Sequence, residues 1–345
     1  MKSISLKITY ISGLKDVVLQ EIQKHDNLFV DTIGQTSIYL DKKSDINTLL
    51  LLKSILNVYI VRQGENLNPS YISNHKSILG ELIEKSVTGG DVFKTFSLSC
   101  AGAHSKEVQE IEDFIANTYR LEKSDEADLE IYIGKNSDLW EIGVRLTKRP
   151  LSLRSYKVAH IKGGINPTIA YAMNTFCNLS EIRSYLNVFS GSGTLLIEAG
   201  LINPEILLLG FDNNKEHITA AIRNTTSAAL VKKIQYTFAD ILNKPDLGTF
   251  DIIASDLPFG MQISKGEDLE KLYQSFVEYV ENHLNQGGVL VAYTAEHEIL
   301  KTSILKSRFS ILKELQLEIS TSVNVYLHLK IFWVCFFIFF AKIFC

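Results

Sequence analysis

The alternation of apolar and polar residues predicts short strands and helices at the start of the chain. Leu6, Ile8 and Tyr10 alternate with polar residues, as in a strand, and a helical pattern follows Gly13. The predicted order is a strand at 6–10, a helix at 13–22, strands at 28–33 and 36–40, and a helix capped by Ser44 or Asp45. The order favours a ferredoxin-like domain over residues 1–65, with a Gly- and Pro-containing linker at 64–69.

The next 85 residues or so predict a second α+β domain, residues 66–150. Its predicted elements are a helix at 76–85, a strand at 93–100, a helix at 105–119, and a hairpin of strands 129–133 and 140–146 around Gly134.

From Asn166 onward, helix and strand patterns alternate regularly. Asn166 and Pro167 are an N-cap and a first helical residue. Strands are predicted at 185–189, 206–211, 234–239, 250–255 and 289–294, with helices at 194–200, 216–229 and 268–285 between them. Repeated strand–helix units indicate a parallel sheet with helices on both faces, so we expect an α/β domain over residues 151–345.

The apolar run at 331–341 is too short for a membrane-spanning helix and is rich in aromatic residues, which favours a buried strand. An altered or extended terminus and a membrane anchor remain alternatives. A hydrophobic fraction of 46% is typical of a globular protein. The N-terminus has no signal-peptide pattern and the four cysteines have no CxxC spacing, so we expect a cytoplasmic protein. A zinc module and a disulfide scaffold are both disfavoured.

Positive charge is concentrated in one stretch although the net charge is −4. Between Ile142 and Ser180 there is no Asp or Glu, while six Lys and Arg residues are present. A solvated loop would explain this, but a phosphate-binding face is favoured because Tyr156 and His160 lie among the cations. The candidate RNA-binding residues are Lys148, Arg149, Arg154, Lys157 and Lys162.

Two glycines follow the first predicted strand of the α/β domain. Gly191 and Gly193 lie between this strand and a helix, where backbone amides can face a ligand. The motif is neither a P-loop nor a complete GxGxxG, and alone it also fits a purely structural turn. Asp212 ends the next strand, 25 residues after Asn187, where a ribose diol would be held. Asp240 ends the strand after that and could accept a hydrogen bond from an adenine amino group.

The most specific motif is Asp256-Leu-Pro-Phe259, which directly follows an apolar strand. There a stiff turn exposes the Asp256 carboxylate, the Pro258 carbonyl and the Phe259 ring together. This trio fits a planar base with an exocyclic amino group, since the two acceptors hold the amino hydrogens and the ring stacks. The alternative is an ordinary turn with Phe259 buried.

These motifs carry a family resemblance. The stretch at 145–300 resembles class I S-adenosylmethionine-dependent methyltransferases that modify exocyclic amino groups, through Asp256-Leu-Pro-Phe259. The runs at 148–156, 166–170 and 191–198 are similar to THUMP-domain RNA guanine-N2 methyltransferases, and 96–100 with 129–146 look like the THUMP unit. The chain departs from the pattern at Asn187, where Asp is more usual, and at Leu257 and Phe259.

The resemblance implies a Rossmann-like methyltransferase sheet after the ferredoxin-like domain and a THUMP-like RNA-binding domain. It also implies that S-adenosylmethionine is bound and a guanosine N2 amino group is methylated. The implied cofactor-binding residues are Asn187, Ser190, Gly191, Gly193, Thr194, Asp212, Asn213, Asp240, Ile241 and Asp256; the implied catalytic residues are Asp256, Pro258 and Phe259.

The implied partner is RNA, with tRNA favoured, and no metal is expected. An activating protein partner is not identifiable from the sequence. The alternatives are rRNA guanine-N2 methylation, adenine-N6 methylation of nucleic acid, a small-molecule methyltransferase and a catalytically silent RNA-binding protein.

Overall fold

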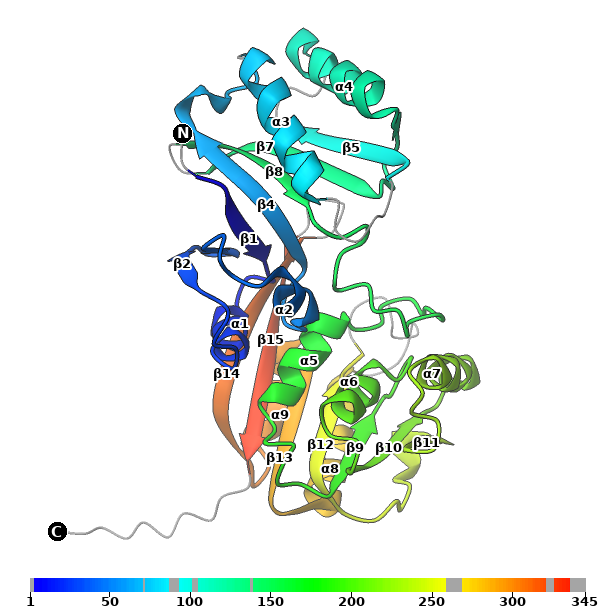
Figure 1. Ribbon diagram of the computed structural model, residues 1–345. Helices are drawn as coiled ribbons and strands as arrows, with labels where there is room; N and C mark the ends of the chain where they lie inside the picture. The colour runs from blue at the N-terminus through cyan, green and yellow to red at the C-terminus, as the bar shows by residue number, and fades with distance from the viewer. Residues whose placement is uncertain are drawn as a thin grey trace, which may run out of the picture. The chain divides into compact units, whose positions relative to one another are not determined.

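The computed structural model describes residues 3–70, 72–86, 93–100, 105–136, 139–258, 269–320 and 326–335 (Figure 1). The chain forms two compact units. The first comprises Met1–Ile11 and Lys15–Leu153, and the second comprises Ser12–Leu14 and Arg154–Cys345. Each unit is described by itself.

The first unit begins with the predicted ferredoxin-like order. Its elements are β1 (Ser5–Thr9), α1 (Lys15–Ile22), β2 (Val30–Ile33), β3 (Ser37–Leu40), α2 (Ile46–Leu51) and β4 (Asn57–Gly64). Asp45 caps α2, because its side chain accepts a hydrogen bond from the Thr48 amide. The strands lie antiparallel in the order β4-β1-β3-β2, which places the two split strand–helix–strand units in one sheet.

The same sheet continues through the second predicted domain. The further elements are the 3₁₀ turn η1 (Glu65–Leu67), α3 (Ile72–Ser86), β5 (Thr95–Cys100), α4 (Lys106–Tyr119), β6 (Glu122–Lys123), β7 (Leu129–Asn136) and β8 (Leu139–Arg145). Pairing of β4 with β8 gives one eight-stranded sheet, β2-β3-β1-β4-β8-β7-β5-β6. The expected boundary and linker at 64–69 therefore lie inside one compact unit.

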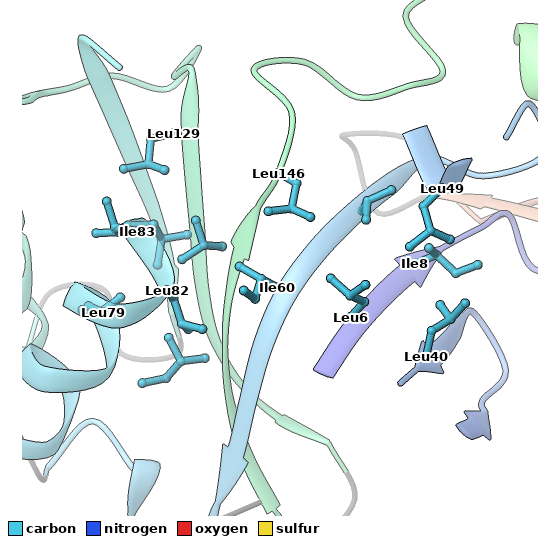
Figure 2. Close-up of a cluster of buried hydrophobic side chains, with 14 of the residues drawn as sticks. Leu6, Ile8, Leu40, Leu49, Ile60, Leu79, Leu82, Ile83, Leu129 and Leu146 are labelled. Atoms are coloured by element: carbon cyan, nitrogen blue, oxygen red, sulfur yellow. The ribbon is translucent and has the colours of Figure 1, made fainter. Parts of the chain in front are cut away.

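One hydrophobic core spans this sheet (Figure 2). Leu6 and Ile8 from β1 are in the same buried cluster as Leu82 and Ile83 from α3 and Leu129 from β7. All five side chains are less than 4% exposed. The two predicted halves of the unit are therefore stabilised by burial of a shared apolar surface.

A buried polar network also joins the two halves of the sheet. The Glu141 carboxylate on β8 accepts hydrogen bonds from Lys7 Nζ on β1 (2.7 Å), the Tyr39 hydroxyl on β3 (2.8 Å), Gln63 Nε2 on β4 (2.7 Å) and the Tyr132 hydroxyl on β7. Burial alone would raise the pKa of Glu141, but Lys7 and the hydroxyl donors outweigh it and lower that pKa. A charged Glu141 thus connects five strands.

The second unit contains the predicted α/β sheet. Its elements are α5 (Pro167–Thr175), β9 (Ser184–Val188), α6 (Thr194–Ile202), β10 (Leu207–Asp212), α7 (Lys215–Ser227), β11 (Ile234–Phe238), the 3₁₀ turn η2 (Ile241–Asn243), β12 (Phe250–Asp256), α8 (Leu269–His283), β13 (Leu284–Thr294), α9 (His297–Leu305), β14 (Ser310–Ser320) and β15 (Tyr326–Cys335). The sheet order is β11-β10-β9-β12-β13-β15-β14. Helices α5, α6 and α7 cover one face of the sheet, while α8 and α9 pack together on the other (Figure 1).

The first five strands of this sheet are parallel, whereas β15 is antiparallel to both β13 and β14. The predicted final strand is confirmed for residues 331–335, while 336–341 lie outside the described residues. Within the described ranges, no helix has the length and apolar character needed to cross a membrane.

Candidate active site

The candidate site lies where β9 and β12 are neighbours at the centre of the parallel sheet. From β9 the chain continues outward to β10, whereas β12 leads to β13 on the other side. Doubly wound sheets bind ligands at the carboxyl ends of strands at such a switch point. At the carboxyl ends of β9, β10, β11 and β12 lie the glycine motif, Asp212–Asn213, Asp240–Ile241 and Asp256–Pro258, as the sequence predicts.

Asn187 links the two central strands by side-chain hydrogen bonds. Its Nδ2 donates to the Ala254 carbonyl of β12 (3.0 Å) and to the Val188 carbonyl (3.1 Å), and the residue is 1% exposed. The Ser255 hydroxyl adds a bond to the Val188 carbonyl (2.8 Å). These contacts give Asn187 a structural role at the strand junction, and its expected role in holding a cofactor stays a prediction. An Asp at this position would not make these two bonds, since a carboxylate cannot donate to carbonyls.

A strained turn connects β9 to α6. Phe189 has φ +55°, which is rare for a bulky side chain, and Gly191 and Gly193 have φ of +52° and +79°. A Cβ on Gly193 would also approach the Tyr236 hydroxyl to 2.3 Å. Steric constraints therefore favour glycine at these positions, in addition to any role that the glycines have in ligand binding. Strain at Phe189 was not predicted, because nothing in a Phe side chain indicates a left-handed backbone.

The turn holds an unsatisfied polar atom. Ser190 is 5% exposed, and its Oγ has no hydrogen-bond partner among the described residues. The nearby hydroxyls of Ser192 and Thr194 bond to each other at 3.3 Å. A buried hydroxyl without a partner costs free energy, so the orphaned Oγ favours a ligand group at this turn.

Asp212 organises the same turn from the end of β10. One carboxylate oxygen accepts from the Gly191 amide (2.9 Å); the other accepts from the Asn214 amide (2.9 Å) and lies 3.2 Å from His217 Nδ1. Four lone-pair positions are available on a carboxylate, so one remains beyond these three contacts. Asn213, next in the chain, is exposed.

Asp240 and Ile241 lie at the adjacent strand end. The Asp240 side chain caps η2 by accepting from the Leu242 amide (2.9 Å), and Ile241 is 1% exposed. The Ala239 amide bonds to the Asp212 carbonyl (3.1 Å), which brings the two acidic strand ends side by side. Both acids are therefore at the edge where a nucleoside would lie.

Asp256 ends the central strand β12. Burial raises the pKa of its carboxyl to about 8, although Lys157 and a hydrogen bond from the Ile165 amide act in the opposite direction. The residue keeps partial solvent exposure, as a group at the base of a ligand site does. The next residue, Leu257, is fully buried, and the Pro258 carbonyl accepts from the Tyr273 hydroxyl (2.9 Å). Phe259 lies outside the described residues.

Residues 154–166, here called the strap, precede α5 and are bonded to helices α6 and α7. Glu198 of α6 anchors its start through Arg154 Nε (3.0 Å) and the Tyr156 hydroxyl (2.7 Å). Asn224 of α7 holds Ala159 by both its amide (2.7 Å) and its carbonyl (2.9 Å). The strap therefore has fixed contacts to α6 and α7.

The strap changes the interpretation of the basic stretch. The Arg154 side chain is 8% exposed and paired with Glu198, so its expected phosphate contact is corrected to an internal ion pair. Lys157 is half-buried and donates to the Ile165 carbonyl (2.8 Å). Lys148, Arg149 and Lys162 are exposed and remain candidates for phosphate contacts. In the portion of the chain that is described, no cluster of His, Cys, Asp and Glu suits a metal ion.

Comparison with known proteins gives a family match and relatives of named activity. Residues 154–324 match the UPF0020 family, described as an RMKL-like methyltransferase domain. The chain is 30% identical over 220 residues to the bovine U6 snRNA (guanine-N(2))-methyltransferase THUMPD2, covering 60% of this chain and 42% of that protein. It is 26% identical over 171 residues to the tRNA (guanine(6)-N2)-methyltransferase of Archaeoglobus fulgidus, covering 42% of this chain and 43% of that one.

In each case the match spans less than half the length of the relative. A similar fold is found in the crystal structure of TrmN from Thermus thermophilus, with a TM-score of 0.77 and 18% identity. That similarity covers 97% of this chain and 100% of the TrmN chain, so it extends over both units.

Proposed function

We propose that the protein methylates the exocyclic N2 amino group of a guanosine in RNA, with S-adenosylmethionine as methyl donor. The proposal starts from the match of residues 154–324 to the UPF0020 family, described as an RMKL-like methyltransferase domain. The favoured substrate is tRNA. The observation that carries the proposal is the position of Asp256 and the Pro258 carbonyl at the sheet's switch point, beside the glycine turn.

The residues at the strand ends fit such a cofactor. Gly191 and Gly193 leave the turn without side chains, and the orphaned Ser190 Oγ can bond to the amino acid end. Asp212 has a lone pair left for a ribose hydroxyl, and Asp240 lies next to it for the adenine. When bound, S-adenosylmethionine supplies an electrophilic methyl group on a positively charged sulfur.

The protein's task in such a transfer is to align and activate the amino group. The lone pair of a guanine N2 atom is delocalised into the ring, which makes the amino group a poor nucleophile. Acceptance of its hydrogens by Asp256 and by the remaining lone pair of the Pro258 carbonyl localises that pair and stabilises the positive charge that develops on nitrogen. When bound, S-adenosylmethionine would give up its methyl group to N2 and leave as S-adenosylhomocysteine, and Asp256 or water would take one N2 proton.

The relatives support RNA as the substrate. One is named for U6 snRNA and the other for tRNA, and both names specify a guanine N2 position. The exposed cations Lys148, Arg149 and Lys162 suit phosphate contacts.

The test is transfer of labelled methyl from S-adenosylmethionine to unmodified total tRNA, with U6 snRNA, rRNA and DNA alongside. Label in guanosine N2 of tRNA, lost in Asp256→Ala, is the expected result. Label only in U6 snRNA or rRNA would correct the substrate, and label in adenosine would overturn the guanine assignment. Cofactor binding without transfer to any of these nucleic acids would contradict the proposed activity.

A further inference from the structure

The inference concerns His217, a side chain in contact with Asp212 to which the proposed reaction gives no role. His217 is the third residue of α7, and Asn214 caps this end of the helix by accepting from the amides of Glu216 (2.8 Å) and His217 (3.4 Å). The imidazole Nδ1 atom lies 3.2 Å from Oδ1 of Asp212. The His217 side chain is 33% exposed and that of Asp212 is 7% exposed, so the contact joins a partly exposed ring to a buried carboxylate.

The chemistry of the two groups decides the direction of this hydrogen bond. Asp212 accepts from the backbone amides of Gly191 and Asn214, both at 2.9 Å, as an ionised carboxylate does. Such a carboxylate has acceptors only, so the imidazole must be the donor. The ring therefore carries a proton on Nδ1, whether it is neutral or charged.

This bond determines which oxygen of Asp212 stays open. Oδ1 accepts from the Asn214 amide and from His217 Nδ1, so both of its lone pairs are used. Oδ2 accepts from the Gly191 amide of the glycine turn and keeps one lone pair. Without the imidazole, Oδ1 would have an open position as well, and the two oxygens would compete for a ligand or for water.

The neighbouring charged residues of α7 do not supply this donor. Lys215 Nζ lies over the Phe238 ring, 5.2 Å from its centroid. Glu216 is exposed, and a carboxylate has no proton to donate. In the described part of the chain, His217 is the side chain that bonds to Asp212, whose other two donors are backbone amides.

We propose that His217 is a positioning residue, which orients Asp212 so that its Oδ2 atom accepts from a ribose hydroxyl of S-adenosylmethionine. The inference rests on the proposed function and adds to it the group that prepares the ribose position before the cofactor arrives. A carboxylate that is already oriented loses less conformational freedom on binding, so the cofactor is bound more tightly.

The test is calorimetric titration of the full chain with S-adenosylhomocysteine and with an analogue whose ribose lacks both the 2′ and the 3′ hydroxyl. Wild-type protein is expected to bind S-adenosylhomocysteine about tenfold or more tightly than the analogue, the usual worth of a hydrogen bond to a charged group. His217→Leu should weaken binding of S-adenosylhomocysteine by about three- to tenfold, the cost of one side chain that must be immobilised on binding. Binding of the analogue should change by less than about twofold, because it has no hydroxyl for Asp212 to accept from.

Two further variants separate positioning from a general effect on the fold. His217→Asn keeps a donor near the position of Nδ1 and should restore most of the affinity for S-adenosylhomocysteine. Thr219→Ala, at an exposed position of the same helix, should leave both affinities unchanged. Equal weakening of both ligands in His217→Leu would overturn the inference and leave the proposed function intact. Wild-type protein that bound neither ligand would contradict the proposed function as well.

Nitrogen-15 NMR of the His217 ring in the wild-type protein tests the same bond without a substitution. At a pH where the ring is neutral, the proton is expected on Nδ1. A neutral ring with its proton on Nε2 could not donate to Asp212 and would overturn the inference, whatever the variants show.

Discussion

The side-chain amide of Asn187 contributes hydrogen bonds to the junction between the two central strands. The side chain is nearly fully buried and donates to carbonyls on both β9 and β12. The family pattern has Asp more usually at this position, but only an amide has the donors that the two carbonyls need. In this chain the residue therefore contributes to the strand interface directly beneath the site.

Asn187→Asp is expected to destabilise the protein by about 2–5 kcal/mol, since the Ala254 carbonyl loses this donor, the Val188 carbonyl keeps that of Ser255, and a carboxylate is buried among them. Chemical denaturation measures this change. Asn213→Asp is the matched control, because Asn213 is exposed and the same substitution there should change stability by less than about 0.5 kcal/mol. Equal effects of the two substitutions would contradict the assigned role.

If Asp256 has its proposed role, activity should depend on pH. In the proposed reaction the ionised carboxylate accepts hydrogens of the amino group, and burial raises the pKa of this carboxyl to about 8 in the free protein. We therefore expect kcat/KM to rise about tenfold per pH unit below 8 and to level off above it. Asp256→Asn should show low activity without this rise. A wild-type profile flat between pH 6 and 8 would contradict the prediction.

The same raised pKa also affects stability. In the unfolded chain Asp256 ionises near pH 4, whereas the folded protein keeps the proton up to about pH 8. The folded state thus binds more protons in this window, and the free energy of unfolding falls as pH rises. Between about pH 4 and 8, the wild-type protein is expected to lose stability relative to Asp256→Asn, which denaturation at several pH values measures.

At the scale of elements, the turn between β9 and α6 depends on space as well as on backbone conformation. Gly193 and Gly248 both have positive φ, +79° and +88°, but a Cβ on Gly248 meets nothing within 4 Å. Gly248→Ala should cost only the strain of about 1–2 kcal/mol. Gly193→Ala should cost about 1–3 kcal/mol more, since its Cβ collides with the Tyr236 hydroxyl, and should weaken cofactor binding. Thermal denaturation measures the loss of stability in each variant, and calorimetry measures cofactor binding. Equal losses of stability in Gly193→Ala and Gly248→Ala would show that the collision with Tyr236 is relieved.

The strap is a second element whose anchor can be tested. Arg154 and Glu198 are both buried, so removal of either alone leaves a buried charge and should cost about 3–5 kcal/mol. The double variant Arg154→Leu with Glu198→Gln keeps an acceptor for Tyr156 and should recover most of that loss. Denaturation of the two single variants and the double variant gives the coupling energy. Additive losses would mean that the pair does not fasten the strap.

For the whole molecule, periodicity predicted most elements and turn chemistry predicted the strand ends that carry Asp212, Asp240 and Asp256. What it could not predict were contacts between residues distant in sequence. Nothing local in Arg154 indicates its pairing with Glu198, and nothing in 1–150 shows that β4 pairs with β8 to merge two expected domains. Long-range pairing depends on tertiary packing, whereas strand and helix patterns depend on neighbours along the chain.

The charge of the whole molecule bears on the proposed binding of RNA. A net charge of −4 disfavours RNA, so the proposed binding would depend on local cations, and three of the five proposed contacts, Lys148, Arg149 and Lys162, are exposed. Replacing all three by Gln should reduce the slope of log affinity against log salt by about 2–3, since each phosphate contact contributes about 0.7–0.9. Arg154→Leu should leave the slope unchanged, because its charge is already paired. RNA binding across a salt series measures both, and a slope sensitive to Arg154 but not to the three exposed cations would show that the internal ion pair opens to meet RNA.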